Sequence, residues 1–341
     1  NNMGKKVTIR DIARLAGVSV TTVSQVLNGK GNRFSKSTRE KILKLRDEYQ
    51  YVPDFHARSL IMRENINTIG VLVPNVSEPF FGTFVEGVQQ VARQEKLIPL
   101  IFSANRDPKL EKAYLEQMVE RSIDGLIIAS ARMTTEMINQ ALINREIPYI
   151  LFDRNYDQVG TRVQTDDYHG GQLAAQHLAE LGHRKFLYLG VNHLTENFKQ
   201  RLAGFKDSLL ASHLSFNEDR DVLHTELSRQ GGYKAAQAVA ESGATAVFTA
   251  NDDIAMGLLR GLRELKVRVP EDISVVGYDD IALDEYVYPQ LTTIHQPIFD
   301  LGVGAAKILL DRIENKHQSE QVEHFPVRLI RRESTAPYHM V

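Results

Sequence analysis

Apolar runs that alternate with amphipathic segments occupy most of this chain and restrict its fold more than any other feature. From Thr68 onward the runs TIGVLVP, LIPLIF, GLIIAS and YILFD are each followed by a segment with helical periodicity. A second series, KFLYLG, DVLHT, AVFTA and ISVVGYD, repeats this arrangement up to Asp279. Buried strands that alternate with helices form parallel sheets. The sequence therefore predicts two doubly wound α/β lobes, and ligands of such sheets bind at the carboxyl ends of the strands.

The stretch from Val7 to Gly29 has a different pattern and predicts two short helices joined by a tight turn. Apolar residues recur at i, i+3, i+4 and i+7 from Ile9 to Ala16. Gly17 can turn the chain without steric penalty, and Ser19 offers an N-cap for the next helix. An ordinary pair of packed helices fits the same pattern. A third helical pattern, Ser37 to Tyr49, completes a three-helix unit and favours a helix-turn-helix, whose second helix enters the DNA major groove.

The charge of the chain is unevenly distributed between its two ends. Residues 1–63 hold 13 Lys and Arg against 5 Asp and Glu, a net charge of +8, whereas the remainder carries −10. A basic head on an acidic body is typical of a phosphate-binding domain attached to a domain that does not bind DNA. The distribution therefore supports double-stranded DNA as a partner of the N-terminal unit.

Several classes of protein are excluded by what the sequence lacks. The absence of cysteine excludes a disulfide scaffold, thiol catalysis and cysteine-ligated zinc. No apolar run approaches the roughly 20 residues of a membrane span, and the N-terminus lacks the apolar core of a signal peptide. A sugar-processing enzyme is the alternative from another functional class, but GxxxxGK[ST], GxSxG and HExxH are all missing. We expect a cytoplasmic protein that is not an enzyme, has no membrane partner and needs no metal or cofactor.

Four long motifs give the chain a specific resemblance. In order, TIRDIARLAGVSVTTVSQVLNG, YVPDFHARSL, TIGVLVPNVSEPFF and VGYDDIALDEYVYPQLTTIHQP resemble the LacI/GalR family of transcriptional repressors, and the resemblance covers essentially the whole chain. It implies a helix-turn-helix head (1–53), a hinge helix and linker (54–66), and a two-lobed, periplasmic-binding-protein-like domain for sugar binding and dimerisation (67–341). Lobe 1 would comprise about 67–167 and 297–325, and lobe 2 about 168–294 and 326–341.

The predicted DNA contacts lie on the second helix and in the hinge. By resemblance, Leu60 is an apolar wedge for the minor groove, with ordinary packing against the body as the alternative. Gln25 stands where many relatives have Arg, and we expect it to read adenine N6 and N7. The predicted DNA-binding residues are Thr8, Ser19, Val20, Thr21, Thr22, Ser24, Gln25, Asn28, Arg58, Ser59 and Leu60.

Aromatic and polar residues follow the predicted strands in a way that suits a neutral sugar. Ring faces stack on the apolar face of a sugar, while carboxylates, amides and guanidinium groups match its hydroxyls. The set resembles that of the ribose-binding proteins with this fold. The predicted ligand-binding residues are Phe80, Phe81, Asp153, Arg154, Arg201, Asn251, Asp279 and Gln296. Taken singly, each could instead be a core residue, a surface pair or a turn cap.

Two features leave the identity of the sugar open. Glu78 stands where the ribose binders carry Asn, so one hydroxyl contact differs. The pair Asp153-Arg154 also resembles the Asp-Arg pair found after this strand in relatives that respond to fructose- or sucrose-type ligands.

The sequence predicts a homodimeric repressor of a sugar-utilisation operon. Two heads would bind a palindromic operator, because a two-fold dimer matches a two-fold site. A small sugar, with ribose as the first candidate, would close the lobes and release the DNA. A corepressor that tightens DNA binding is an open alternative. Binding to a phosphorylated carrier protein also stays open, although no motif requires it.

Overall fold

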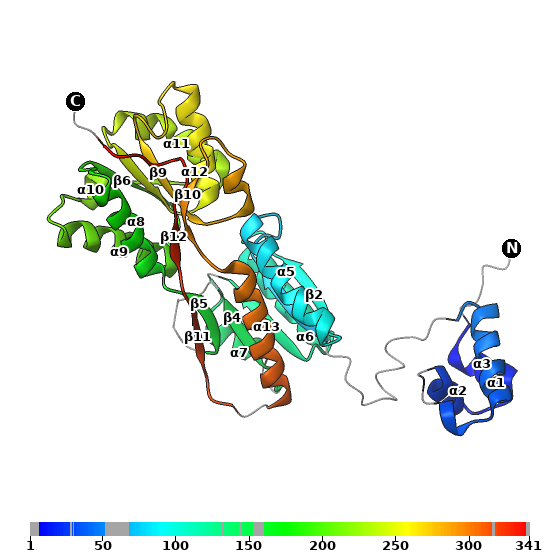
Figure 1. Cartoon of the computed structure of the whole chain (residues 1–341). Coiled ribbons are helices and arrows are strands. Elements are labelled where there is room, and N and C mark those ends of the chain that lie inside the picture. The colour runs from blue at the N-terminus through cyan, green and yellow to red at the C-terminus, as the bar shows by residue number, and fades with distance from the viewer. Residues whose placement is uncertain are drawn as a thin grey trace. The chain divides into compact units, whose positions relative to one another are not determined.

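The computed structural model describes residues 7–27, 29, 31–51, 68–130, 132–142, 145–152, 160–315 and 318–338. The chain forms two compact units, Asn1–Ile66 and Asn67–Val341 (Figure 1). Within the described residues, no helix is long and apolar enough to cross a lipid bilayer.

The N-terminal unit is the predicted helix-turn-helix. It contains α1 (Ile9–Ala16), α2 (Val20–Leu27), the 3-10 turn η1 (Gly31–Arg33) and α3 (Lys36–Glu48). The chain leaves α1 at Gly17, whose φ of +72° lies in the left-handed region where glycine is favoured. The Oγ of Ser19 then accepts a hydrogen bond from the N–H of Thr22, so Ser19 caps α2 as predicted. The buried side chains of this unit are mainly Ile12, Ala13, Ala16, Val23, Val26 and Ile42.

The first sheet of the larger unit is entirely parallel and has the order β11-β5-β4-β3-β1-β2. Its strands are β1 (Thr68–Val73), β2 (Ile98–Ser103), β3 (Gly125–Ala129), β4 (Tyr149–Phe152), β5 (Arg162–Thr165) and β11 (Val322–Phe325). Residues that alternate along each strand face opposite sides of the sheet. One side packs against α5 (Pro79–Gln94) and α13 (Ile298–Glu314), and the other against α6 (Pro108–Glu120) and α7 (Thr135–Ala141).

The second sheet has the order β12-β10-β9-β8-β6-β7. Its strands are β6 (Phe186–Val191), β7 (Val222–Thr225), β8 (Ala246–Thr249), β9 (Ser274–Asp279), β10 (Thr292–His295) and β12 (Arg328–Ile330). The prediction of parallel sheets is confirmed except at this edge, where β12 pairs antiparallel with β10. The associated helices are α8 (Asp167–Glu180), α9 (Glu196–Ala211), α10 (Glu218–Asp221), α11 (Arg229–Glu241), α12 (Asp252–Glu264) and the 3-10 helix η2 (Ala282–Glu285).

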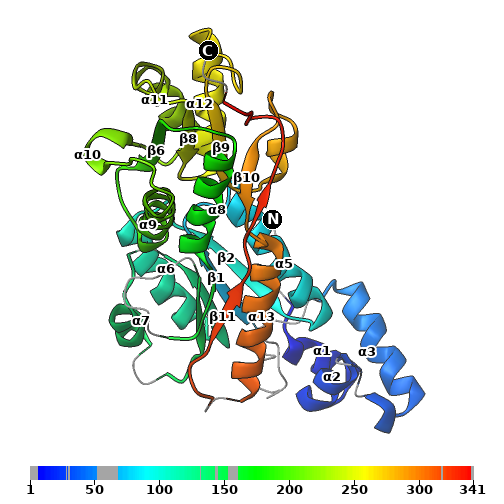
Figure 2. The same ribbon diagram turned by 60° about the vertical axis from the view of Figure 1, so that its left-hand side comes forward.

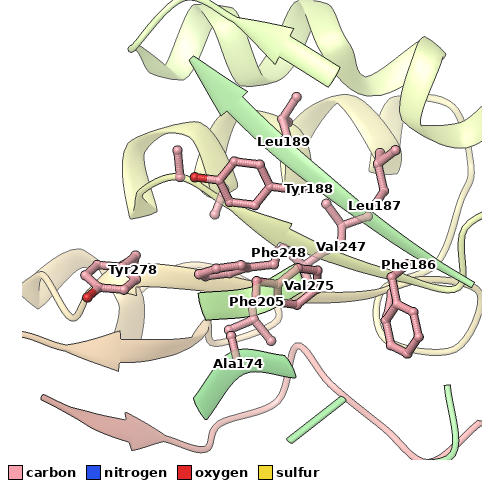
Figure 3. Packing of buried hydrophobic residues seen from close by; sticks show 14 of the residues in the cluster. Ala174, Phe186, Leu187, Tyr188, Leu189, Phe205, Val247, Phe248, Val275 and Tyr278 are labelled. Atoms are coloured by element: carbon pink, nitrogen blue, oxygen red, sulfur yellow. The ribbon is translucent and has the colours of Figure 1, made fainter. Parts of the chain in front are cut away.

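Large aromatic side chains fill the core of the second lobe. Tyr188, Phe205, Phe248 and Tyr278 are fully buried and contact one another around the central strands (Figure 3). Burying a large side chain contributes about 1.5–3 kcal/mol to folding, so this cluster is a major source of stability for the lobe.

The two lobes are connected by three crossings of the chain. It passes from β5 to α8, from β10 to α13, and from β11 to β12 (Figure 2). These connections are short and can act as a hinge between the lobes.

Candidate nucleic-acid interface and ligand cavity

The second helix of the head presents a small polar surface. Thr21 is exposed, while Val20, Thr22 and Gln25 are half-buried. Ser24 was predicted to belong to this outward set, but the structure buries it to 6% exposure. The helix is short and packs on both α1 and α3, so periodicity alone could not show that Ser24 faces inward.

Of the remaining predicted DNA-contact residues, the structure describes Ser19 and Thr8. Ser19 is exposed, and its hydroxyl lies 2.9 Å from that of Thr22. Thr8 is exposed and forms a capping box with Asp11 at the start of α1. The other four positions lie outside the described residues, namely Asn28, Arg58, Ser59 and Leu60.

A cavity of about 460 Å³ lies between the two lobes at the carboxyl ends of their strands. Its volume is within the roughly 300–1,000 Å³ range of small-molecule sites. The structure brings five of the eight predicted ligand-binding residues together in its wall: Phe80, Phe81, Arg201, Asn251 and Asp279. Gln296 lies directly behind Asp279, and the pair Asp153-Arg154 lies outside the described residues.

The first lobe contributes aromatic rings to the cavity. α5 begins at Pro79, after a loop (residues 74–78) that follows β1, and this places Phe80 and Phe81 in the first helical turn. Their rings meet edge to face, with centroids 5.1 Å apart, and Phe80 also stacks on Phe152 at 5.8 Å. These contacts fix an apolar face against which a sugar ring can lie.

Arg201 is the most constrained polar group in the second lobe. Its guanidinium donates from Nε to Oδ1 of Asp167 over 2.8 Å and from Nη1 to the carbonyl of Ala250 over 2.7 Å. It also lies 3.7 Å above the ring centroid of Tyr278. Burial disfavours the charged form, but the neighbouring carboxylate of Asp167 raises the pKa of Arg201 above its ordinary value. The site therefore holds a permanent, pre-oriented cation.

Asp279 reaches the cavity from an unusual backbone conformation. Its φ is +129° and that of Asp280 is +62°, so two consecutive non-glycine residues adopt left-handed values. Such strain persists only where the surroundings hold it in place, and it gathers at functional sites. Here the carboxylate of Asp252 accepts hydrogen bonds from the backbone N–H groups of Asp280 at 2.7 Å and Ile281 at 3.2 Å. Thr293 donates to the same carboxylate at 2.7 Å.

A second buried carboxyl group lies next to Asp252. Asp284 is fully buried, and burial together with the charge of Asp252 raises its pKa far above the ordinary value. Asp252 accepts hydrogen bonds from three donors, which favours its ionised form, so the proton of the pair resides on Asp284. The charged partner thus holds the loop that carries Asp279.

One hydrogen-bonded chain connects the cavity to the crossings between the lobes. Gln296 donates from Nε2 to Oδ1 of Asp279 over 2.8 Å and accepts from the hydroxyl of Thr165 over 2.7 Å. Thr165 ends β5 in lobe 1, and Asp279 ends β9 in lobe 2. Gln296 therefore joins both lobes at the base of the cavity.

Several wall residues were missed by sequence reasoning. The sequence singled out Glu78 but not its partner Arg106, and the two form a bidentate ion pair at the cavity, with Nη2 to Oε2 at 2.8 Å. Glu111 is buried and accepts from Ser130 at 2.8 Å. The other unpredicted polar or aromatic wall residues include Arg132, Asn192, His193, Thr195, Asn197, Phe198, Thr225 and Glu226. Most of them lie within a few residues of the carboxyl end of a strand, whereas Asn197 and Phe198 lie in the first turn of α9.

The chemistry of the cavity is that of recognition. Carboxylates, cations and aromatic rings line it together, and the cations Arg106 and Arg201 are each paired with a carboxylate. Within the described part of the chain, no cluster of three or more acidic or histidine side chains is arranged to hold a metal ion. The fold and the two sites together define a DNA-binding regulator that carries its own small-molecule cavity.

Comparison with known proteins places the chain in one family. It matches the bacterial regulatory proteins of the lacI family over residues 8–54 and the periplasmic binding protein-like domain over residues 175–335. The HTH-type transcriptional repressor PurR of Vibrio vulnificus (strain CMCP6) is 33% identical over 330 residues, which cover 96% of this chain and 98% of PurR. The chain belongs to the LacI family of DNA-binding transcriptional repressors.

Solved structures agree with this assignment. A LacI family transcriptional regulator from Enterococcus faecalis V583, with bound ribose, is 40% identical with a TM-score of 0.74, and the match covers 80% of this chain and 100% of that one. The lac repressor dimer bound to operator and the anti-inducer ONPF is 27% identical with a TM-score of 0.84, over 97% and 100% of the two chains. These relatives are transcriptional regulators and not enzymes, as the sequence predicted.

Proposed function

We propose that this protein represses a sugar-utilisation operon as a homodimer and that D-ribose releases it from a palindromic operator. The ligand enters the cavity between the lobes, draws them together and changes the geometry of the segment leading to the heads. In this account the cytoplasm is the site of action, and no cofactor takes part.

The observation that carries the proposal is the pairing of an aromatic platform with oriented polar groups. Phe80 and Phe81 offer ring faces from lobe 1, while Arg201, Asn251 and Asp279 offer donors and acceptors from lobe 2. Adjacent sugar hydroxyls suit a carboxylate and a guanidinium that are already held in position, because little entropy is lost on binding. The relative of 40% identity that was solved with ribose supports this sugar in particular.

We assign the parts of the chain accordingly. Residues 1–53 would bind DNA, 54–66 would form the hinge helix and linker, and 67–341 would bind sugar and dimerise. Arg58, Ser59 and Leu60 are proposed to contact the minor groove, and Asn28 the major-groove face of the operator. Asp153 and Arg154 would complete the sugar site from lobe 1.

Calorimetric titration of the full chain tests the effector. D-ribose should bind with one site per subunit, and Asp279→Ala should lose binding by about 10-fold or more, since a charged hydrogen bond contributes about 1.5–3 kcal/mol. Asp272→Ala is the matched control, because Asp272 pairs with Arg268 on the surface of the same lobe. Binding of fructose or sucrose in place of ribose would replace the proposed effector while leaving the cavity assignment intact.

A further inference from the structure

Arg33 is hydrogen-bonded to Gln25, the residue of α2 for which the sequence predicted a contact with adenine. Its Nη2 donates a hydrogen bond to Oε1 of the Gln25 side chain. Gln25 is half-buried on α2, whereas Arg33 is exposed in η1, eight residues further along the chain. A guanidinium group therefore stands beside the helix that enters the major groove.

The place of this guanidinium is set by packing. Arg33 lies over the ring of Phe34, with 5.0 Å from Cζ to the centroid, and Phe34 packs against the core of the head. Gly31 of the same turn is buried so closely on α2 that an added Cβ would lie 3.3 Å from Cα of Val26. Both ends of η1 are thus attached to the three-helix unit, and Arg33 is held next to Gln25.

The pairing changes which base edge Gln25 can recognise. A free glutamine reads adenine by accepting from N6 and donating to N7. Here the side-chain oxygen of Gln25 already accepts from a cation, so N–H donors and one positive charge dominate the pair. Guanine presents two acceptors, O6 and N7, in the major groove, whereas adenine presents one acceptor and one donor.

We propose that Gln25 and Arg33 act as one unit that reads guanine, in place of the adenine predicted for Gln25 alone. Arg33 is then a specificity-determining residue that contributes from outside the recognition helix. This inference rests on the DNA-binding function of the family and is independent of the effector.

In vitro selection tests it on the full chain. A library of duplexes with randomised palindromic half-sites is enriched by the wild type, Gln25→Ala, Arg33→Ala and Arg46→Ala, and then sequenced. The half-site position whose preference disappears with Gln25→Ala identifies the base pair that Gln25 reads. Arg46 is the control, because it is a cation of the same head that pairs locally with Asp47.

The expected result is that the wild type enriches guanine over adenine at that position by about 10-fold or more. Arg33→Ala should shift the preference toward adenine, since the released amide can again accept and donate, whereas Arg46→Ala should keep guanine. The inference is overturned if the wild type selects adenine there. It is equally overturned if Arg33→Ala weakens binding to all sequences alike, because that is the behaviour of a phosphate contact. Failure to enrich any sequence would instead contradict DNA binding itself.

Discussion

Arg201 and Asp167 form a buried ion pair at the cavity wall, with Nε to Oδ1 at 2.8 Å and side chains only 4% and 9% exposed. The pair joins α9 to α8 inside lobe 2. Burial raises the pKa of Asp167, and the charge of Arg201 opposes that shift. Because removal of one partner would leave the other charge buried and unpaired, the two residues must be tested by conservative changes.

Arg201→Lys should weaken ribose binding by about 10- to 100-fold while the protein stays folded. Lysine keeps a positive charge near Asp167, but it lacks the planar fork that bonds Asp167 and Ala250 together. Titration calorimetry gives the affinity, and Arg260→Lys is the control, since Arg260 is an exposed cation paired with Glu264 on α12. Unchanged ribose affinity in Arg201→Lys would remove Arg201 from the site.

Glu78→Gln should raise the affinity of the cavity for anionic ligands relative to neutral ones. Glu78 holds Arg106 in a bidentate ion pair, so Glu78→Gln removes one negative charge from beside this cation in the cavity wall. We expect D-ribose 5-phosphate to gain affinity relative to D-ribose, measured as the ratio of the two dissociation constants at low salt. Glu86→Gln, an exposed site on α5, should leave the ratio as in the wild type. A ratio unaffected by Glu78→Gln would show that the pair does not set the charge of the cavity.

Gln296→Glu should make ribose binding dependent on pH. Two carboxyl groups at the 2.8 Å separation of Gln296 and Asp279 cannot both ionise easily, so the pair would keep one proton near pH 6. That proton replaces the donor of the native amide, and its loss toward pH 9 should weaken binding. Affinity of the variant should therefore fall as pH rises, while that of wild type stays level. A variant with no such fall would place Asp279 away from the sugar.

His177 should make the folded body sensitive to acid. Burial, with smaller contributions from Arg331 and His183, lowers its pKa to about 4, whereas an unfolded histidine titrates near about 6.5. The unfolded chain binds more protons between these values, so stability is complete above about pH 6.5 and falls as pH decreases toward 4, by up to about 3 kcal/mol.

Replacing His177 with glutamine tests that loss. Glutamine cannot titrate but can still bond Thr335, which lies 2.9 Å from His177 Nε2. Thermal melting between pH 4.5 and 7.5 should show a shallower decrease in Tm for His177→Gln. His169→Gln, at an exposed position on the same helix, should retain the wild-type decrease. Identical profiles for all three proteins would contradict the assignment.

Much of the fold could be predicted because its signals are local. Gly17 and Ser19 mark the turn of the head through their own backbone and side-chain chemistry. The strands appear as short apolar runs because both faces of a parallel sheet are covered. The antiparallel edge strand β12 has no such signal, since only three residues near the C-terminus take part.

Cavity residues could be predicted only where the chemical type of the side chain itself suits a sugar. Phe80, Phe81 and Asp279 were found because aromatics and carboxylates at strand ends suit a sugar. The Glu78–Arg106 pair and the link from Thr165 through Gln296 join residues 28 and 131 positions apart. Such pairings depend on how the strands are ordered in space, which periodicity does not reveal. The burial of Ser24 likewise follows from helix packing and not from its polarity.

The most direct test of the central claim is a measurement of operator binding by the full chain. Fluorescence anisotropy reports this binding with and without D-ribose. The palindromic duplex obtained by selection serves as the operator. The account predicts that ribose weakens binding, that fructose does not, and that Asp279→Ala still binds DNA but no longer responds to ribose. Tighter binding in the presence of a sugar would identify a corepressor and contradict the proposed direction of control.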